Sequence, residues 1–390
     1  MPQLTQYHLA APGVFHFGVR GVEQEETGTH FPSDSLFSAI FSAWLAQGRA
    51  PDELTDLFPR QEMNNDGVLK NFYQTTAPFL LTSLFPRANQ LRFYPALPLS
   101  WLLSKGKLQE LHEGHRLKEV KRIKYISEAL FLKALASHWL DDWVPAEKSP
   151  TPADQGVYLQ GGDLWLTRDE ISLLPPALNP KTGKGDPLKA LRHARVWHTD
   201  KAPRVTVDRI TNASAIFHTG RLRYSPECGF WFGVQWQAND AGLADGLRDA
   251  LAILADDGLG AERNAGYGHF TVTETNTLAL PTPQAGDFFV NLSRYSPKTE
   301  EVPAIFADER TAYTLTSVAG WLSSPVEPAQ RRRRLWLFQE GSVLQQPAEA
   351  GALGRLVDVR PVYQQTQFSH PVWRYGLALP VKIQPAGGAR

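Results

Sequence analysis

Gly258-Leu-Gly-Ala-Glu-Arg-Asn-Ala-Gly-Tyr-Gly-His-Phe-Thr-Val272 leads from a segment with helical periodicity into one that alternates like a strand. Its four glycines permit positive φ, and without a Cβ they let backbone N–H groups approach another group closely. Arg263, Asn264 and His269 add side-chain donors. The stretch therefore indicates a phosphate-binding loop, with a glycine-rich connector that binds nothing as the alternative. It differs from dinucleotide and nucleoside-triphosphate loops, which follow a strand and open a helix.

The segments before this loop predict two strands and a helix. Ala213–Arg223 and Phe230–Trp236 flank a turn-rich link and are typical of a β-hairpin. Leucines then recur every three or four residues from position 243 to 254, which predicts a helix that ends at Gly258. Gly268–Glu274 is expected to form the strand after the loop.

The N-terminal segments complete the pattern. Leu4–Gly18 alternates polar and apolar residues and predicts a first strand. Ser33 is expected to cap a helix whose apolar positions between 36 and 44 share one face. The resulting order, β-α-β-β-α-β, is the ferredoxin-like arrangement, with a long insertion at about 50–211 after the first helix.

A second, degenerate copy of this unit is expected beyond the Pro- and Thr-rich linker Leu278–Gly286. Strands are expected at Asp287–Tyr295, Tyr313–Trp321, Arg334–Phe338 and Val372–Ile383, with a short helix at Thr299–Phe306. The predicted fold class is α+β, with two ferredoxin-like domains at 1–280 and 281–390. The length of 390 residues fits two domains, because it exceeds what one core usually supports.

Composition and charge narrow the function classes. The single cysteine, Cys228, rules out an internal disulfide and suits a reducing cytoplasm. No run of eighteen apolar residues occurs, so no membrane span is expected. The formal net charge is +0, yet basic residues cluster at Lys118–Lys124, Arg192–Arg209 and Arg331–Arg334. Such local basic stripes are typical of a protein that binds nucleic acid on one face.

The insertion carries two of these basic clusters. Lys118–Ser127 places four cations within two helical turns and predicts a helix with a basic face. Arg192–Arg209 mixes cations with Trp197, which suits a strand that follows a phosphate backbone and stacks on a base.

Several segments, spread in order along the chain, together resemble a known family. They resemble the RAMP subunits numbered four of type III-A CRISPR (Csm) interference complexes, through Phe31–Ile40, Lys124–Ile126, Val207–Arg209, Gly258–Gly268, Leu337–Val343 and Trp373–Leu379. The resemblance implies two ferredoxin-like domains with a protruding thumb hairpin in the first, and binding of the 5′ repeat-derived tag of CRISPR RNA. It also implies contact with the large polymerase-cyclase subunit and the backbone RAMP subunit, Csm subunit 3, with target RNA reached indirectly.

The predicted RNA-binding residues come from the loop, the basic clusters and this resemblance. They are His16, Lys121, Arg122, Lys124, Tyr125, Arg192, Arg195, Arg204, Arg209, Gly258, Gly260, Arg263, Asn264, Gly266, Gly268, His269, Arg331 and Arg333.

A catalytic alternative rests on His16, which lies near where related RAMP ribonucleases place a catalytic histidine. General acid–base catalysis needs a second group, and the sequence does not fix whether His218, His269 or Tyr267 lies close enough. His112 and His115 have metal-like spacing without an evident third ligand. We therefore expect a non-catalytic RNA-binding subunit without cofactor or metal. A metal-independent repeat endoribonuclease and a purely protein-bridging subunit are the alternatives.

Overall fold

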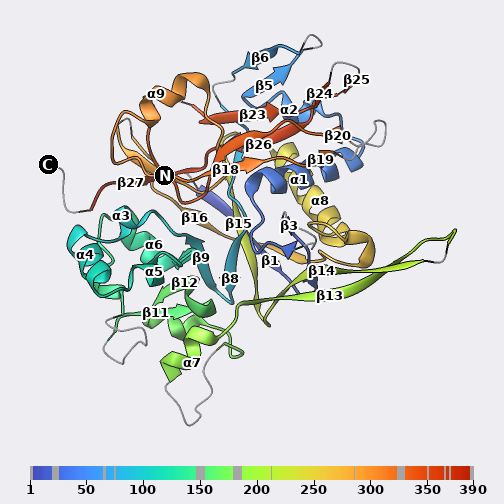
Figure 1. The fold of residues 1–390 in the computed structure, drawn as a ribbon. Coiled ribbons are helices and arrows are strands. Elements are labelled where there is room, and N and C mark those ends of the chain that lie inside the picture. Colours follow the sequence, from blue (N-terminus) through green and yellow to red (C-terminus); the bar gives the residue numbers. More distant parts are fainter. Residues whose placement is uncertain are drawn as a thin grey trace.

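The computed structural model describes residues 3–19, 26–64, 67–73, 76–145, 154–178, 187–211, 213–284, 286–322, 330–348, 351–363, 366–368 and 370–386. Figure 1 shows a body of mixed helices and sheets from which one long hairpin projects. In this part of the chain no helix is both long and apolar enough to cross a membrane.

A nine-stranded sheet organises the N-terminal part of the chain. Its path runs β11 (Gly156–Leu159), β12 (Leu164–Thr167), β10 (Tyr125–Ser127), β9 (Leu91–Pro95), β8 (Phe85–Ala88), β15 (Cys228–Trp236), β1 (Gln3–Ala10) and β16 (Thr271–Ala279), with β7 (Phe79–Leu81) also on β15. All pairs are antiparallel except β10 with β12. Strands from the insertion therefore extend the same sheet that the N-terminus begins.

Two long helices pack together over this sheet, as the sequence predicts. α1 (Ser33–Ala46) buries Leu36, Phe37 and Ile40, and α8 (Ala241–Asp257) buries a matching row of leucines. α8 ends at Gly258, whose N–H donates to the carbonyl of Leu254 at 2.8 Å. The predicted cap of α1 is wrong, because Pro32 occupies the N-cap position.

The predicted hairpin partner is also wrong. β14 (Ser214–Tyr224) pairs with β13 (Trp197–Val207) and with β2 (Val14–Phe15), and not with β15. The place beside β15 is taken by β7 and β8 from the insertion. The predicted first strand is interrupted after Ala10, so that β2 leaves the main sheet and joins the hairpin.

The C-terminal part forms smaller sheets. β17 (Phe288–Asn291) lies between β22 (Val343–Gln345) and β27 (Pro380–Ile383), and β26 (Trp373–Leu377) leads a sheet through β23 (Gly354–Asp358), β5 (Arg60–Met63) and β6 (Leu69–Phe72). Its two-stranded pairs are β18 (Leu315–Val318) with β21 (Leu335–Phe338), β19 (Trp321–Leu322) with β20 (Gln330–Arg331), and β24 (Val362–Tyr363) with β25 (Thr366–Gln367). In the N-terminal part, β3 (Gly18–Val19) pairs with β4 (Glu26–Thr27). All four strand regions predicted for the C-terminal part contain strands.

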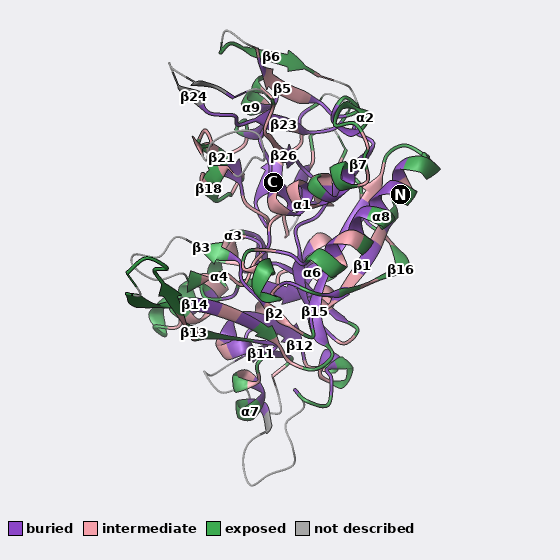
Figure 2. Ribbon diagram, turned by 90° about the vertical axis from the view of Figure 1, so that its right-hand side faces the viewer, coloured by how far each residue is buried: buried purple, intermediate pink, exposed green. Residues whose placement is uncertain are grey.

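The remaining helices are short. They are α2 (Asp52–Thr55), α3 (Leu99–Leu102), α4 (Lys105–Glu113), α5 (Leu117–Val120), α6 (Glu128–Leu135), α7 (Pro187–His193) and α9 (Val302–Ile305), with 3-10 turns η1 (Asp141–Trp143), η2 (Gln160–Gly162), η3 (Asp169–Leu173), η4 (Arg263–Ala265) and η5 (Thr299–Glu301). The large core joins both parts of the chain, since Phe37 and Phe58 contact Tyr375. Figure 2 shows this buried interior and the exposed outer part of the hairpin.

Candidate nucleic-acid interface

The glycine-rich loop, residues 258–268, has the predicted backbone conformation. Gly258, Gly260, Gly266 and Gly268 have φ of 86°, 95°, 79° and 91°. A Cβ on Gly268 would lie 2.3 Å from the carbonyl oxygen of Leu259, and one on Gly260 would lie 2.4 Å from that of His16. At Gly266 a Cβ would meet nothing within 4 Å. Gly260 and Gly268 thus permit close approach to the protein's own backbone.

Most of the loop's backbone donors are bound within the protein. N–H groups that donate to protein carbonyls belong to Leu259, Ala261, Ala265, Gly266, Tyr267 and Gly268. These donors are not available to an anion while the loop keeps this conformation. What the loop presents outward is side chains: Arg263, Asn264 and His269 are exposed. A hollow of about 460 Å³ lies against the loop, lined by Arg204 and residues 260–265.

His16 joins the loop to the base of the hairpin. It is only 3% exposed, and its Nδ1 lies 2.8 Å from the carbonyl oxygen of Gly220 in β14. Its own carbonyl accepts the N–H of Ala261 at 2.9 Å. The side chain is therefore enclosed between two backbone segments and not displayed on the surface.

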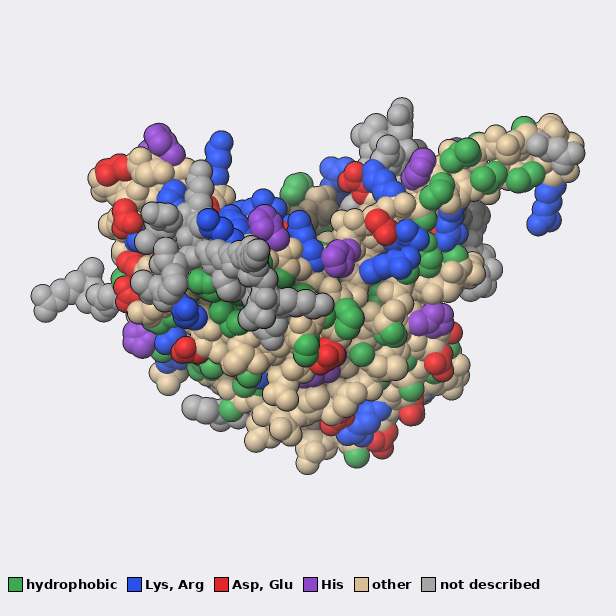
Figure 3. Space-filling view, turned by 90° about the horizontal axis from the view of Figure 1, so that it is seen from below, with side chains coloured by type: hydrophobic (Ala, Val, Ile, Leu, Met, Phe, Trp, Pro, Cys, Tyr) green, Lys and Arg blue, Asp and Glu red, His purple; other side chains and the backbone are tan. Residues whose placement is uncertain are grey.

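The projecting hairpin, β13 with β14, carries two of the predicted residues. Arg204 pairs with Glu262 of the loop at 2.9 Å, and its guanidinium lies 5.2 Å from the ring centroid of Tyr267. Arg209 is exposed in the turn beyond β13. The outer strands also expose apolar side chains, with Val205 57% and Ile216 71% exposed. Figure 3 shows hydrophobic side chains, in green, along the arm that projects to the right.

The basic helix predicted at Lys118–Ser127 is wrong, although its cations do gather. α5 ends at Val120, and the chain then turns into β10. The backbone N–H groups of Lys124 and Tyr125 both donate to the carbonyl of Asp163. The segment forms a strand and not a helix, because Tyr125 and Ile126 are buried in the main sheet.

We call the surface around Gly161 and Gly162 the basic turn. It consists of Arg122, Lys124, Asp163, Arg192 and Arg195 around these two glycines. A Cβ on Gly161 would lie 3.4 Å from Nη2 of Arg122 and 3.6 Å from Nη1 of Arg195, and one on Gly162 would lie 3.6 Å from Nη2 of Arg192. Gly161 and Gly162 have φ of 71° and 106°, so the turn is shaped by glycine and covered by guanidinium groups.

The basic turn draws on segments far apart in the sequence. Arg192 lies on α7, and not on the predicted strand, and it pairs with Glu119 at 2.9 Å. Arg195 follows α7 and is exposed. Figure 3 shows Lys and Arg side chains gathered across the middle of the face seen from below.

The ion pairs of the basic turn leave its cationic groups open to solvent. Asp163 accepts from Arg122 Nε at 3.0 Å and from Lys124 Nζ at 2.9 Å. The two cationic side chains remain 56% and 57% exposed. Asp163 itself is buried, with only 12% of its side chain exposed. A phosphate that approaches from solvent can therefore reach both cations while Asp163 keeps its hydrogen bonds to them.

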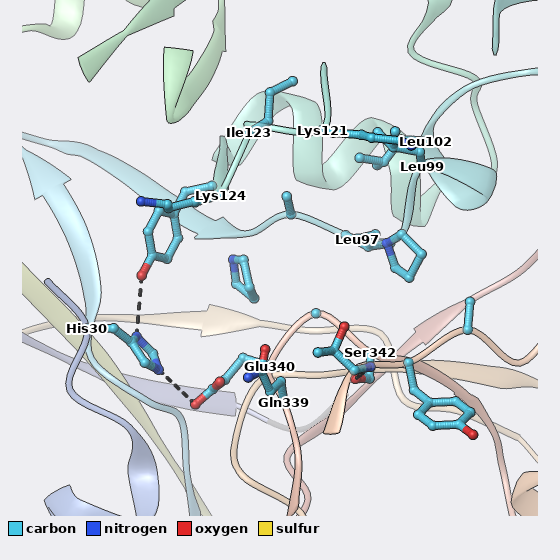
Figure 4. Close-up of a pocket in the computed structure, with 18 of the residues that line it drawn as sticks. His30, Leu97, Leu99, Leu102, Lys121, Ile123, Lys124, Gln339, Glu340 and Ser342 are labelled. Carbon is cyan, nitrogen blue, oxygen red and sulfur yellow. Dashed lines mark hydrogen bonds and ion pairs between the residues drawn. The ribbon is translucent and has the colours of Figure 1, made fainter. Parts of the chain in front are cut away.

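A cleft of about 790 Å³ lies beside the basic turn, between the N-terminal and C-terminal parts of the chain. One wall comes from residues 95–99, 102, 120, 121 and 123–125, and the other from 311–314 and 339–342. Figure 4 shows Leu97, Leu99 and Leu102 on the first wall, and Gln339 and Ser342 on the second. Lys124 belongs to both the cleft and the basic turn.

A chain of polar side chains closes one end of the cleft. Tyr125 Oη lies 3.3 Å from Nδ1 of His30, whose Nε2 lies 3.1 Å from Oε1 of Glu340 (Figure 4). Arg294 Nε approaches the same oxygen at 3.1 Å, and Ser83 donates its hydroxyl to it. Burial alone would raise the pKa of Glu340, but the charges of His30 and Arg294 and the hydrogen bonds bring it down to about 2. Burial raises the pKa of Tyr125, so this residue remains a neutral phenol.

His30, Arg294 and Glu340 were not predicted as site residues. They come from three distant segments, and only Glu340 lies in a stretch that carries the resemblance, Leu337–Val343. Its place in that stretch was the available signal. Of the predicted set, Lys121 lies on the cleft rim and Tyr125 at its end.

The last predicted cations lie in the C-terminal part. Only Arg331 belongs to a strand, β20, and its guanidinium lies 5.0 Å from the ring centroid of the exposed Trp321. Arg333 donates to the carbonyl of Asp358 at 2.8 Å, and burial lowers its pKa. Within the described ranges, no group of three or more His, Cys, Asp or Glu side chains is arranged to hold a metal ion.

Comparison with known proteins addresses the family. The model of the CRISPR Csm4 C-terminal domain matches residues 284–383. The CRISPR system Cms protein Csm4 of Mycobacterium tuberculosis (strain CDC 1551 / Oshkosh) is 27% identical over 168 residues, covering 42% of this chain and 51% of the relative. The chain is thus similar to Csm4 proteins, through its C-terminal domain and through relatives at 20–27% identity. The Csm4 protein of Methanocaldococcus jannaschii is 20% identical over 371 residues, covering 89% of this chain and 86% of the relative.

Solved structures extend the likeness to the fold. A Csm3-Csm4 subcomplex of the type III-A CRISPR-Cas interference complex contains a chain with a TM-score of 0.60 and 16% identity, covering 98% of this chain and 100% of that one. A Csm1-Csm4 cassette in complex with cA4 gives a TM-score of 0.51 at 16% identity, covering 99% of this chain and 100% of that one. The α+β fold is therefore similar to that of the matched chains in these two Csm4-containing assemblies. The chain spans about half the length of the first curated relatives that it matches.

Proposed function

We propose that this chain is a non-catalytic, RNA-binding subunit of a type III-A CRISPR effector complex that acts in antiviral defence. It binds the 5′ repeat-derived tag of the CRISPR RNA. The observation that carries this proposal is the convergence of Arg122, Lys124 and Arg195 on the basic turn. A cluster of cations from separate segments suits a phosphate backbone, since Arg122 and Lys124 remain more than half exposed although both pair with Asp163.

The partners follow from the Csm4 relatives. Because solved relatives occur as Csm3-Csm4 and Csm1-Csm4 assemblies, the proposed protein partners are a Csm3-like backbone subunit and a Csm1-like large subunit. Target RNA is then reached through the guide. A buried, single cysteine fits the reducing cytoplasm as the place of action.

The finer description of the fold belongs to the same proposal. In the main sheet, the strand order β16-β1-β15-β8 with α1 and α8 supports a ferredoxin-like unit within residues 1–280. A second, degenerate unit is proposed within 281–390. On this proposal β13 and β14 are the protruding thumb hairpin.

Salt dependence of RNA binding tests the proposal. Single-stranded RNA with the tag sequence is titrated with the Arg122→Ala, Lys124→Ala, Arg195→Ala triple variant across a salt series. Each lost phosphate contact reduces the log–log slope by about 0.7, so we expect a slope lower by about two units and weaker binding to all sequences alike.

The matched control removes three exposed cations elsewhere, in Lys70→Ala, Lys105→Ala, Arg248→Ala. This variant has the same net charge and should keep the wild-type slope. An equal loss in both triple variants would assign the effect to net charge. An unchanged slope in the first would assign the basic turn to a protein interface.

The endoribonuclease alternative is less well supported, because His16 is enclosed and its Nδ1 faces a backbone carbonyl. Incubation of the purified chain with repeat RNA and a chelator separates the two functions. We expect intact RNA. A defined product that disappears in His16→Ala would establish the alternative instead.

A further inference from the structure

The two walls of the cleft differ in chemistry. The N-terminal wall is mainly apolar, with Leu97, Leu99 and Leu102. The C-terminal wall offers hydroxyl and amide groups, among them Thr314 and Gln339. A flat heterocycle between such walls would contact carbon atoms on one side and hydrogen-bonding groups on the other. The volume of about 790 Å³ is within the range of about 300–1,000 Å³ for small-ligand sites.

The charges that line the cleft favour an anion. Lys121, Lys124 and Arg294 line it, and Glu340 is the carboxylate among them. That carboxylate is already engaged by Arg294, His30 and Ser83. The guanidinium of Arg294 is about nine-tenths buried, and among the described residues its Nη1 has no hydrogen-bond partner. The cleft thus retains positive charge next to apolar surface, as a nucleotide requires.

The cleft is continuous with the basic turn. Lys124 lines the cleft while its Nζ lies 2.9 Å from Asp163, which also holds Arg122. Lys121 is exposed at the rim, one residue before Arg122. A backbone that follows the basic turn therefore reaches the cleft without crossing an uncharged gap.

We infer that the cleft takes one unstacked nucleotide of the bound RNA, with its base between Leu99 and Thr314 and its phosphate at Lys121. This inference rests on the proposed RNA-binding function and adds a specific subsite to it. Sequence-specific RNA recognition commonly uses bases splayed out of the strand, and each base held by a side-chain surface adds to binding.

An abasic scan of the RNA tests the subsite in the full-length chain. Each position of a short single-stranded tag RNA is made abasic in turn, and its affinity is measured. We expect one position at which the loss weakens binding roughly tenfold, the size expected for one held base. In Leu99→Asn the intact RNA should bind as weakly as that abasic RNA does to wild type, with no further loss on combining the two changes.

A second variant avoids any risk to folding. Lys121→Ala removes an exposed side chain. The affinity lost in this variant should not add to the affinity lost when the RNA carries a neutral methylphosphonate beside the responsive position. The control Lys105→Ala, on the neighbouring α4, should keep both wild-type responses. Thermal denaturation of each variant verifies that it is folded.

Three results would overturn the inference. If no abasic position weakened binding more than the others, no base would occupy the cleft. The same would follow if the losses from Leu99→Asn and from the abasic position were additive. If Leu99→Asn kept its RNA affinity but no longer bound a Csm1-like or Csm3-like subunit, the cleft would be a protein-docking site. Absence of RNA binding in wild type would instead remove the proposed function itself, which the salt series detects separately.

Discussion

The glycine-rich loop and the basic turn are both glycine turns with positive φ and arginines nearby, but different forces hold them. In the loop, a Cβ at Gly268 would lie 2.3 Å from backbone. In the basic turn, a Cβ at Gly161 would meet only guanidinium groups, at 3.4 Å and beyond. Backbone contacts hold the glycine-rich loop, whereas ion pairs hold the basic turn and the adjacent cleft. A positive-φ glycine therefore reports the shape of a backbone and does not by itself identify a ligand.

The largest expected effect tests the loop. Gly268→Val would strain a residue at φ 91° and force apart two backbone segments. Strain and overpacking each cost about 1–3 kcal/mol, so we expect the free energy of unfolding to fall by about 4 kcal/mol. Chemical denaturation measures it.

Gly266→Val is the matched control, since its φ is similar at 79° but no atom lies within 4 Å of its Cβ. Strain alone should cost about 1–3 kcal/mol there. If Gly268→Val were as stable as Gly266→Val yet bound RNA more weakly, the loop would be a ligand site after all.

The second prediction tests whether ion pairs stabilise the protein around the cleft. The pKa of Glu340 is about 2 in the folded chain, below its ordinary value of 4.5. Its contribution to stability is therefore complete above pH 4.5 and is lost as the pH falls toward 2. The difference corresponds to about 3 kcal/mol. Denaturation midpoints measured from pH 7 downward should show this loss.

Glu340→Gln should be less stable at pH 7, because Arg294 would stay buried without its carboxylate partner. Its stability should also fall less steeply in acid than that of wild type. Glu309→Gln, at an exposed carboxylate, should leave the pH profile unchanged. An acid profile shared by wild type and Glu340→Gln would mean that other groups dominate.

Local patterns in the sequence predicted helices and strands, but they did not predict which distant strands would pair. The leucine row of α8 and the glycine exit after it are set by neighbours within one helix, so both predictions were confirmed. β7, Phe79–Leu81, is buried along its whole length and has no alternation to mark it. The sequence therefore could not show that β7 and β8, and not β14, would lie beside β15.

The candidate site was predicted in the same uneven way. Arg122, Lys124, Arg192 and Arg195 were singled out by charge, but two were assigned to a helix that does not form and two to a strand that begins later, at Trp197. Tyr125 and Ile126 are compatible with both helical and strand periodicity, and pairing within the main sheet makes this segment a strand. The cleft assembles from residues that lie far apart in the sequence, and no local pattern links them.

The smallest expected effect separates geometry from charge at the basic turn. Gly161→Ala keeps every cation but places a Cβ 3.4 Å from Arg122 Nη2 and 3.6 Å from Arg195 Nη1. We expect a stability loss of about 1–2 kcal/mol from the positive φ. RNA affinity should fall only a few fold, with the salt slope unchanged, because the same number of phosphates is neutralised. A slope reduced as in the triple charge variant would mean that the two arginines contact phosphate only when the turn is undisturbed. No change in affinity would mean that their arrangement over the glycines is irrelevant to RNA, and that their charge alone matters.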